Sequence, residues 1–318
     1  MRHILVTGGA GFIGSNLIKE LLKDPDTHVS SIDNFDPFYS IEQKRLNIGA
    51  FTENANFDFI EGDIRNIEDL RKIRNIDVIV HLAAKAGVRP SINNPVLYQD
   101  VNVSGTQTLL EFAKERGIKQ FVFASSSSVY GVNQNVPWHE EEKLLPISPY
   151  ASTKLSGEML GHVYSHLYDI RFIALRFFTV YGPGQRPDLA IHKFFKSILQ
   201  NQPIPVYGDG STSRDYTFVA DTVKGVIAAI NYDKSNFEII NLGNHKTVTL
   251  SELIEAVEKA CGQKAIIDRQ PEQPGDVPQT YANISKAQEL LGYNPSTNLH
   301  DGLQSFFAWF KEKETVVQ

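Results

Sequence analysis

Cysteine is almost absent from this chain, because Cys261 is the only one in 318 residues. A single thiol cannot form an internal disulfide, and it leaves no thiolate cluster to bind a metal. We therefore expect a reducing compartment and no metal site. Cys261 is best interpreted as a small packed residue on a helix.

Positively charged residues are also fewer than negatively charged ones. The chain has 31 Lys and Arg against 37 Asp and Glu, which gives a formal net charge of -6. No cluster of basic residues alternates with aromatic residues, as the groove of a nucleic-acid-binding protein would require. Nucleic acid is therefore excluded as an expected partner.

Long apolar runs are missing as well. The first three residues lead directly into a short apolar run that ends in glycines. This run is too short for a signal peptide or a membrane-spanning helix, so we expect a cytoplasmic protein with no membrane partner. The 42% of apolar residues is nevertheless enough for one large α/β domain and a smaller lobe.

Short β-branched and aromatic runs alternate along the chain with longer stretches of helical period. The runs occupy residues 4–6, 29–32, 57–60, 78–80, 121–123 and 172–175. This alternation is typical of βαβ units, and the few polar residues within the runs indicate helices on both faces of the sheet. The sequence predicts a doubly wound parallel sheet of the α/β class, that is, a Rossmann fold.

A different pattern begins after about Val180, where glycine and proline break the chain repeatedly. We expect a smaller, mixed α/β C-terminal lobe there. It includes a helix over residues 251–261, with Ser251 as the N-cap signal and Gly262 as the C-cap. The predicted domains are residues 1–178 with a returning segment at about 215–245, and a lobe of residues 179–214 and 246–318.

A glycine-rich turn, Thr7-Gly8-Gly9-Ala10-Gly11-Phe12-Ile13-Gly14, follows the first apolar run. Glycine permits positive φ in the turn, close approach of the backbone to a pyrophosphate, and close packing of helix on strand. The N–H groups at the start of the next helix can then bind phosphate. We therefore assign these residues to a dinucleotide: Gly8, Gly11, Phe12, Ile13 and Gly14.

Asp33 ends the second run, at the distance expected for a carboxylate that binds the adenine ribose hydroxyls. A carboxylate repels a 2'-phosphate, and Asn34 rather than Arg follows it, so we expect NAD and not NADP. Asp63 and Ile64, after the third run, are expected to flank the adenine. The cofactor site is completed by the segment after the fourth run: Leu82, Ala83 and Ala84.

Candidate catalytic residues follow the fifth run, where Ser126 lies within four consecutive serines, Ser125–Ser128. Farther along, Tyr150 and Lys154 are spaced i and i+4, on one face of a helix. A phenol with a pKa of about 10 is a poor base, but a nearby ammonium favours the phenolate. Lys154 also has donors for the nicotinamide ribose. Such pairs occur by chance on exposed helices, so the assignment depends on the glycine turn and the serines around it.

Together these motifs resemble the extended short-chain dehydrogenase/reductase family over essentially the whole chain. The resemblance implies that Tyr150 removes the proton of a sugar 4-hydroxyl while hydride passes to NAD, and that Ser126 hydrogen-bonds the same oxygen. The resemblance also implies that Tyr150 and Lys154 contact the cofactor. It further implies a homodimer, formed through the helices near residues 101–115 and 150–168.

Two positions next to Ser126 separate the reactions within this family. Dehydratases of the family carry Asp-Glu there and decarboxylases carry Glu at the second position, whereas this chain has Ser127 and Ser128. Reversible oxidation at one carbon remains, which inverts that carbon if the sugar turns before it is reduced again. The alternatives are a UDP-glucuronate decarboxylase or sugar 4,6-dehydratase, and a redox sensor that has kept the fold without the chemistry.

Residues 175–188 are similar to the glucuronate-specific 4-epimerases of the family. Arg186 suits a sugar carboxylate because its planar fork makes bidentate bonds, although it could instead form an ion pair with Asp188. The resemblance places Arg214 on the pyrophosphate of a UDP-sugar and Asp276 on its ribose. The remaining predicted sugar contacts are Ser127, Ser128 and Thr179. We predict C4 epimerisation of UDP-glucuronate, with UDP-glucose or UDP-N-acetylglucosamine as alternative substrates.

Overall fold

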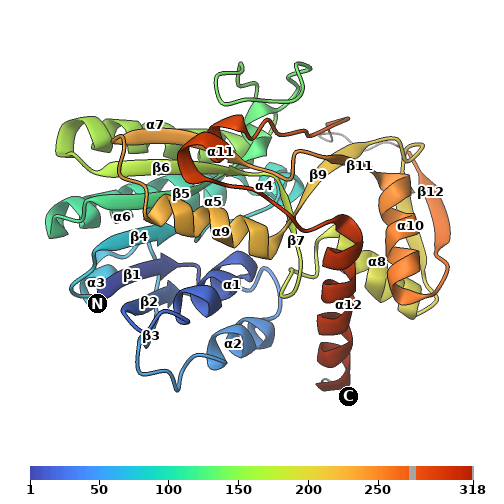
Figure 1. The fold of residues 1–318 in the computed structure, drawn as a ribbon, viewed down its shortest axis with the longest axis horizontal. Coiled ribbons are helices and arrows are strands. Elements are labelled where there is room, and N and C mark those ends of the chain that lie inside the picture. The colour runs from blue at the N-terminus through green and yellow to red at the C-terminus, as the bar shows by residue number, and fades with distance from the viewer. Residues whose placement is uncertain (272–276, 317–318) are drawn as a thin grey trace.

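Seven parallel strands form the central sheet of the computed structural model, which describes residues 1–271 and 277–316 (Figure 1). Their order is β10–β6–β5–β4–β1–β2–β3. The order runs outward in both directions from β1 and β4, so the prediction of a doubly wound sheet is confirmed. All six predicted runs lie within strands, which are β1 (Arg2–Thr7), β2 (Thr27–Asp33), β3 (Phe57–Glu61), β4 (Val78–His81), β5 (Gln120–Ser126) and β6 (Arg171–Phe177), with β10 (Phe237–Leu242) as the seventh.

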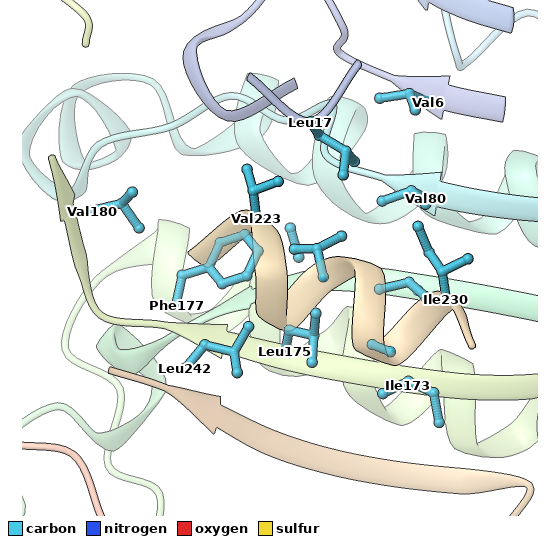
Figure 2. Packing of buried hydrophobic residues seen from close by; sticks show 14 of the residues in the cluster. Val6, Leu17, Val80, Ile173, Leu175, Phe177, Val180, Val223, Ile230 and Leu242 are labelled. Carbon is cyan, nitrogen blue, oxygen red and sulfur yellow. The ribbon is translucent and has the colours of Figure 1, made fainter. Parts of the chain in front are cut away.

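Helices cover both faces of this sheet. Alternate residues of a strand point to opposite faces, so Val6 and Val80 pack into one apolar cluster while Leu5 and Ile79 pack into another. Figure 2 shows α9 lying along the first cluster. That face is covered by α1 (Phe12–Leu21) and α9 (Val219–Ile230), and the other by α3 (Ile67–Arg71), α6 (Gly105–Arg116) and α7 (Pro149–Tyr168).

Short helices line the carboxyl edge of the sheet, where the connections are longest. They are α2 (Ile41–Gly49), α4 (Val88–Asn93), α5 (Pro95–Tyr98), a π-helical turn (Gln99–Ser104) that runs into α6, and a 3₁₀ turn (Ser127–Tyr130) after β5. Helix α11 (Ser285–Leu291) packs against α9 and β10.

A smaller group of elements lies to one side of the sheet (Figure 1). Its core is strongly aromatic, with Phe194, Phe195, Phe306 and Phe310 all buried. The elements around this core are β7 (Thr179–Tyr181), β8 (Pro203–Tyr207), β9 (Ser213–Phe218), β11 (Thr247–Thr249), β12 (Ile266–Gln270), α8 (Ala190–Leu199), α10 (Leu250–Cys261) and α12 (Leu299–Val316). Strands and helices are mixed here, as the glycine and proline pattern predicted.

Helix α10 begins one residue earlier than predicted, and Thr249 rather than Ser251 is its N-cap. The Thr249 hydroxyl accepts from the Glu252 N–H at 3.1 Å, and the Glu252 carboxylate accepts from the Thr249 N–H at 2.8 Å. This reciprocal pair satisfies two N–H groups at once, which a Ser251 cap would not. Ser251 instead donates to the Gly210 carbonyl. The predicted C-cap is confirmed, because Gly262 has φ of 72°.

Cys261 lies in the last turn of α10, half-buried, with its thiol directed at the Glu258 carbonyl. This is the packed helical position that the sequence predicted. Across residues 1–271 and 277–316, every helix is either too short or too polar to cross a bilayer.

Candidate active site

The glycine turn joins β1 to α1 and leaves no room for side chains. Gly8 has φ of 72°, and a Cβ on it would lie 2.7 Å from the Ala83 nitrogen. A Cβ on Gly14 would lie 2.4 Å from the Gly8 carbonyl oxygen. Helix α1 has no side-chain cap, so its first N–H groups can bind phosphate oxygens. The predicted residues at this helix start are Gly11, Phe12 and Ile13.

Asp33 and Asn34 lie at the carboxyl end of β2, beside the glycine turn. The Asp33 carboxylate accepts from the N–H groups of Ala10 at 3.2 Å and Phe35 at 2.9 Å. Burial raises the pKa of Asp33, while the charge of Lys44 opposes that rise. These two N–H bonds fix the carboxylate beside the glycine turn.

Asp63 accepts a hydrogen bond from Asn34 at 2.9 Å, so two predicted cofactor residues meet. Hydrogen bonds from Arg65 lower the pKa of Asp63 to about 2. Ile64 is placed differently: its side chain packs beneath Gly105 of α6 and is 6% exposed. The Ile64 side chain is therefore buried against α6.

The segment after β4 closes against the glycine turn. The Ala83 N–H donates to the Thr7 hydroxyl at 3.2 Å, and this contact holds Leu82, Ala83 and Ala84 against the end of β1. The next residue, Lys85, is tied down by Asn102, which accepts from its N–H at 2.7 Å and donates to its carbonyl at 3.0 Å.

Asn102 was not predicted, although it connects the two halves of the site. It lies in the π-helical turn and also donates to the Thr153 hydroxyl at 3.0 Å, which in turn donates to the Tyr150 carbonyl. A lone asparagine carries no recognisable signal in a sequence. Only the π-helical turn, a feature frequent at functional sites, marks it in the structure.

Helix α7 carries the predicted catalytic pair in its first two turns. Its N-cap is Ser148, whose hydroxyl accepts from the Ala151 N–H at 3.1 Å. Lys154 is buried and donates to the Ala124 carbonyl of β5 at 2.7 Å. Its ammonium lies 5.9 Å from the centre of the Tyr150 ring, and burial lowers the pKa of Lys154 to about 8.

The pKa of Tyr150 differs from what the sequence led us to expect. Burial raises it, while a hydrogen bond with Ser126 and the positive charge of Arg186 act to lower it. Lys154, whose ammonium donates to the Ala124 carbonyl, is not among the groups that shift this pKa. Arg186, predicted only as a substrate contact, therefore also acts on the phenol.

Ser126 is the last residue of β5 and the N-cap of the 3₁₀ turn. Its hydroxyl oxygen accepts from the Ser128 N–H at 3.2 Å and from the Ser128 hydroxyl at 2.9 Å. Together with its bond to Tyr150, this brings Ser126, Tyr150 and Lys154 into one cluster.

A cavity of about 190 Å³ opens beside the serines. Four predicted substrate residues are in its wall: Ser127, Ser128, Thr179 and Arg214. The sequence did not single out the others, which are Val88, Gly131, Trp138, Ile147, Ser148, Val277 and Thr280. None of the described residues in this wall is acidic, so the wall offers no carboxylate pair for an elimination reaction. Asp276, the predicted ribose contact, lies outside the described residues.

Arg186 lies in the loop after β7 and is not in the wall of this cavity. Its guanidinium is bidentate to Asp188, with Nε and Nη2 at 2.9 and 3.0 Å from the carboxylate oxygens, and lies 5.5 Å from the centre of the Phe38 ring. The ion pair that we considered as the alternative role of Arg186 is therefore present. Arg214 donates to the Ser213 carbonyl and faces the cavity.

Comparison with known proteins agrees with this arrangement. The chain is 40% identical to a UDP-glucuronate 4-epimerase of Thermodesulfobacterium geofontis, over 100% of this chain and 99% of that protein. The crystal structure of the UDP-glucuronic acid 4-epimerase of Bacillus cereus with UDP-glucuronic acid and NAD superposes with a TM-score of 0.92 at 41% identity, covering 98% of this chain and 99% of that one.

A UDP-glucose 4-epimerase of Thermotoga maritima, solved with UDP-glucose, is also similar. Its TM-score is 0.89 at 31% identity, over 98% of this chain and 99% of that one. A sequence model of the family described as GDP-mannose 4,6 dehydratase matches residues 5–306. The chain therefore belongs to this branch of the short-chain dehydrogenase/reductase family.

Proposed function

We propose that the protein is an NAD-dependent 4-epimerase of UDP-sugars, with UDP-glucuronate as its substrate. The observation that carries this proposal is the Ser126, Tyr150 and Lys154 cluster beside a cavity with Ser127 and Ser128 in its wall. That cluster can exchange a proton with a sugar hydroxyl, and the described wall has no acids for dehydration. The similar UDP-glucuronate 4-epimerases support the same assignment.

The residues that would hold NAD fit a dinucleotide. The backbone of the glycine turn packs too closely for a Cβ at Gly8 or Gly14, the start of α1 has no side-chain cap, and Asp33, which we assign to the ribose, lies beside the turn. Lys154, buried beside Tyr150, has donors for the second ribose. When bound, NAD supplies a reversible hydride acceptor whose positive charge also favours the Tyr150 phenolate.

Tyr150 moves the proton and Ser126 holds the oxygen. The phenolate takes the proton of the sugar 4-hydroxyl as hydride leaves C4, which produces a 4-keto sugar. The Ser126 hydroxyl hydrogen-bonds the same oxygen throughout. The proton and hydride return after the sugar has turned over, so C4 is inverted and nothing is consumed.

This rotation of the sugar requires that the protein bind the nucleotide firmly and the sugar loosely. Arg214 on β9, with Val277 and Thr280, lines the side of the cavity that we assign to the nucleotide. We assign the sugar to the part of the wall with Val88 and Ile147, which offers it apolar surface. A ring that slides over such a surface can present either face to the cofactor.

The uronate preference rests on Arg186 with Ser127, Ser128 and Thr179. Oxidation at C4 of a glucuronate makes a β-keto acid, which loses carbon dioxide when its carboxylate lines up with the carbonyl π system. Charge-assisted bonds of about 1.5–3 kcal/mol each can hold the carboxylate out of that alignment. These residues would then preserve the substrate as well as bind it.

A neutral UDP-sugar is the second candidate substrate, and the Arg186–Asp188 pair favours it. A guanidinium that already has a bidentate carboxylate partner has less capacity for a second one. The similarity to a UDP-glucose 4-epimerase points in the same direction.

One experiment separates these possibilities. The purified protein is incubated with UDP-glucuronate, UDP-glucose and UDP-N-acetylglucosamine in turn, and the products are resolved by NMR and weighed by mass spectrometry. The proposed function requires an equal-mass C4 epimer of UDP-glucuronate, without accumulation of reduced nicotinamide in solution. Loss of carbon dioxide or water would establish a lyase, and conversion of a neutral sugar alone would establish the second candidate.

We also propose that the protein acts as a homodimer, that it is cytoplasmic, and that the chain divides into the domains predicted from the sequence. Three apolar residues on the outer face of α7, Met159, Val163 and Leu167, are 49%, 46% and 59% exposed. An apolar stripe of this kind is suited to another copy of the chain. Light scattering should give a dimer for the wild type and a monomer for Val163→Glu.

A further inference from the structure

A buried row of polar side chains crosses three neighbouring strands directly behind the serines. Ser125, Arg176 and Asn241 are register partners on β5, β6 and β10, and all three are buried. Partnered residues of parallel strands point to the same face, here the face that Phe123 and α7 share. We call these three residues the polar row.

Glu158 of α7 accepts hydrogen bonds from two residues of the polar row, Ser125 and Arg176. Its two carboxylate oxygens accept from Nε and Nη2 of Arg176 at 2.9 and 2.8 Å, and Ser125 donates to the same carboxylate. The Arg176 and Glu158 side chains are 1% and 0% exposed. Nη1 of Arg176 donates to the Tyr130 hydroxyl at 2.9 Å, which donates to the Asn241 side chain at 2.8 Å.

This network adjoins every part of the catalytic cluster. Glu158 lies one turn beyond Lys154 and two turns beyond Tyr150 on α7, so all three are on one helix face. Ser125 immediately precedes Ser126, and Tyr130 ends the 3₁₀ turn that holds the two cavity serines.

The network also reaches the wall of the cavity. Asn241 donates to the Trp138 carbonyl at 2.9 Å, and the Tyr130 ring stacks on the Trp138 indole with centres 4.9 Å apart. Nη1 of Arg176 donates to the Glu140 carbonyl at 3.2 Å. One connected set of bonds therefore joins α7, the serines and the Trp138 wall.

Stability alone does not explain a charged pair at this depth, because the cost of desolvating two charges offsets their attraction. An apolar pair of similar volume would stabilise the fold about as well. A saturated polar network instead specifies one geometry. We propose that Glu158 and Arg176 are positioning residues, which hold the serines and the Trp138 wall in register with Tyr150 and so set the rate of proton and hydride transfer. This proposal rests on the proposed function.

The test compares two variants with the wild type. Ser125→Ala removes one hydrogen bond and keeps the ion pair, while the double change Glu158→Leu with Arg176→Met removes the charges together. We expect kcat to fall about 3- to 10-fold in the first and about 10- to 100-fold in the second, because small misplacements of reacting groups cost rate steeply. KM and melting temperature should stay close to the wild type, and the isotope effect on kcat for substrate deuterated at C4 should increase.

Ser165→Ala is the matched control, because Ser165 is buried on the same helix and donates to the Asn236 carbonyl far from the site. Its kcat should not change. Turnover equal to the wild type in Ser125→Ala and in the double variant, per cofactor-loaded molecule, would overturn the proposal. If the double variant fails to fold, an unchanged kcat in Ser125→Ala alone is decisive against it.

Failure of the proposed function would be seen separately, as a wild-type protein that epimerises none of the three UDP-sugars. The readout then becomes ionisation of Tyr150, followed by ultraviolet absorbance against Tyr150→Phe. Because the Ser126 hydrogen bond lowers the Tyr150 pKa, a displaced Ser126 should raise it in Ser125→Ala. An unchanged titration would overturn the positioning role without any turnover measurement.

Discussion

The two sides of the candidate site are built in different ways. The catalytic side consists of Ser126, Tyr150 and Lys154, which come from strand β5 and from helix α7 packed on the sheet. Lys154 is only 4% exposed. The substrate side is assembled from several connections, and Arg186, in the loop after β7, forms an ion pair with Asp188. The difference follows from the chemistry, since transferred atoms require fixed distances whereas a sugar that turns over requires room.

The largest effect should come from the catalytic side. Tyr150→Phe should lower kcat by about 10²- to 10⁴-fold, the range for a lost general acid/base, while NAD content and melting temperature stay close to the wild type. Steady-state kinetics with UDP-glucuronate gives the rate, and the cofactor released on denaturation gives the occupancy. A rate within about tenfold of the wild type would remove Tyr150 from its role.

On the substrate side, a change should alter selectivity more than rate. Arg186→Ala should lower kcat/KM for UDP-glucuronate by about 10- to 100-fold, while that for UDP-glucose changes much less. Arg71→Ala is the control, because Arg71 pairs only with surface carboxylates away from the site. The measurement is the ratio of the two kcat/KM values. A ratio that matches the control would mean that Arg186 does not bind the uronate.

Close packing of α7 on the sheet can be tested independently of chemistry. A Cβ on Gly161 would lie 2.1 Å from the buried Phe172 ring, so Gly161→Ala should destabilise the fold by about 1–3 kcal/mol. Gly49→Ala, at the end of α2 with nothing within 4 Å, should be neutral or stabilising by up to about 1 kcal/mol. Urea unfolding of both variants measures the difference. Equal stabilities would show that α7 moves away from the sheet at little cost.

The last expected effect is a gain in stability. Burial lowers the pKa of Lys154 from 10.5 to about 8, so the folded state carries a penalty while the lysine is charged. Lys154→Met should abolish turnover but stabilise the fold by about 1–2 kcal/mol near neutral pH. The folded protein loses this proton near pH 8 and the unfolded chain near pH 10.5, so wild-type stability should rise over that interval and the gain should shrink. A gain that does not depend on pH would rule out this cause.

Local patterns made much of this protein predictable. The glycine turn, Asp33 and the Tyr150–Lys154 spacing each depend on a few consecutive residues, and the structure brings them to one edge of the sheet. Strand β10 was not among the predicted runs, although it lies within the predicted returning segment. The directions of its side chains are set by its pairing with β6, a strand that is its neighbour in the sheet but not along the chain.

The parts that could not be predicted depend on contacts between distant segments. Trp138 and Thr280 meet in one cavity although 141 residues separate them in the chain. The Tyr150 pKa depends on Arg186, which a helix-spacing argument cannot include. The row of Ser125, Arg176 and Asn241 follows from strand register, which no single stretch of sequence specifies.

The position of α9 in the sequence also has a consequence for synthesis of the chain. Helix α9, which covers the apolar face made by Val80, Ile173 and Leu175, lies at residues 219–230, after β7, α8, β8 and β9 have been made (Figure 2). While the ribosome translates residues 182–212, α1 is the only one of the two covering helices that has been made. The nascent chain therefore exposes a broad apolar surface for the time of this translation, and a holding chaperone should bind it most strongly in that window.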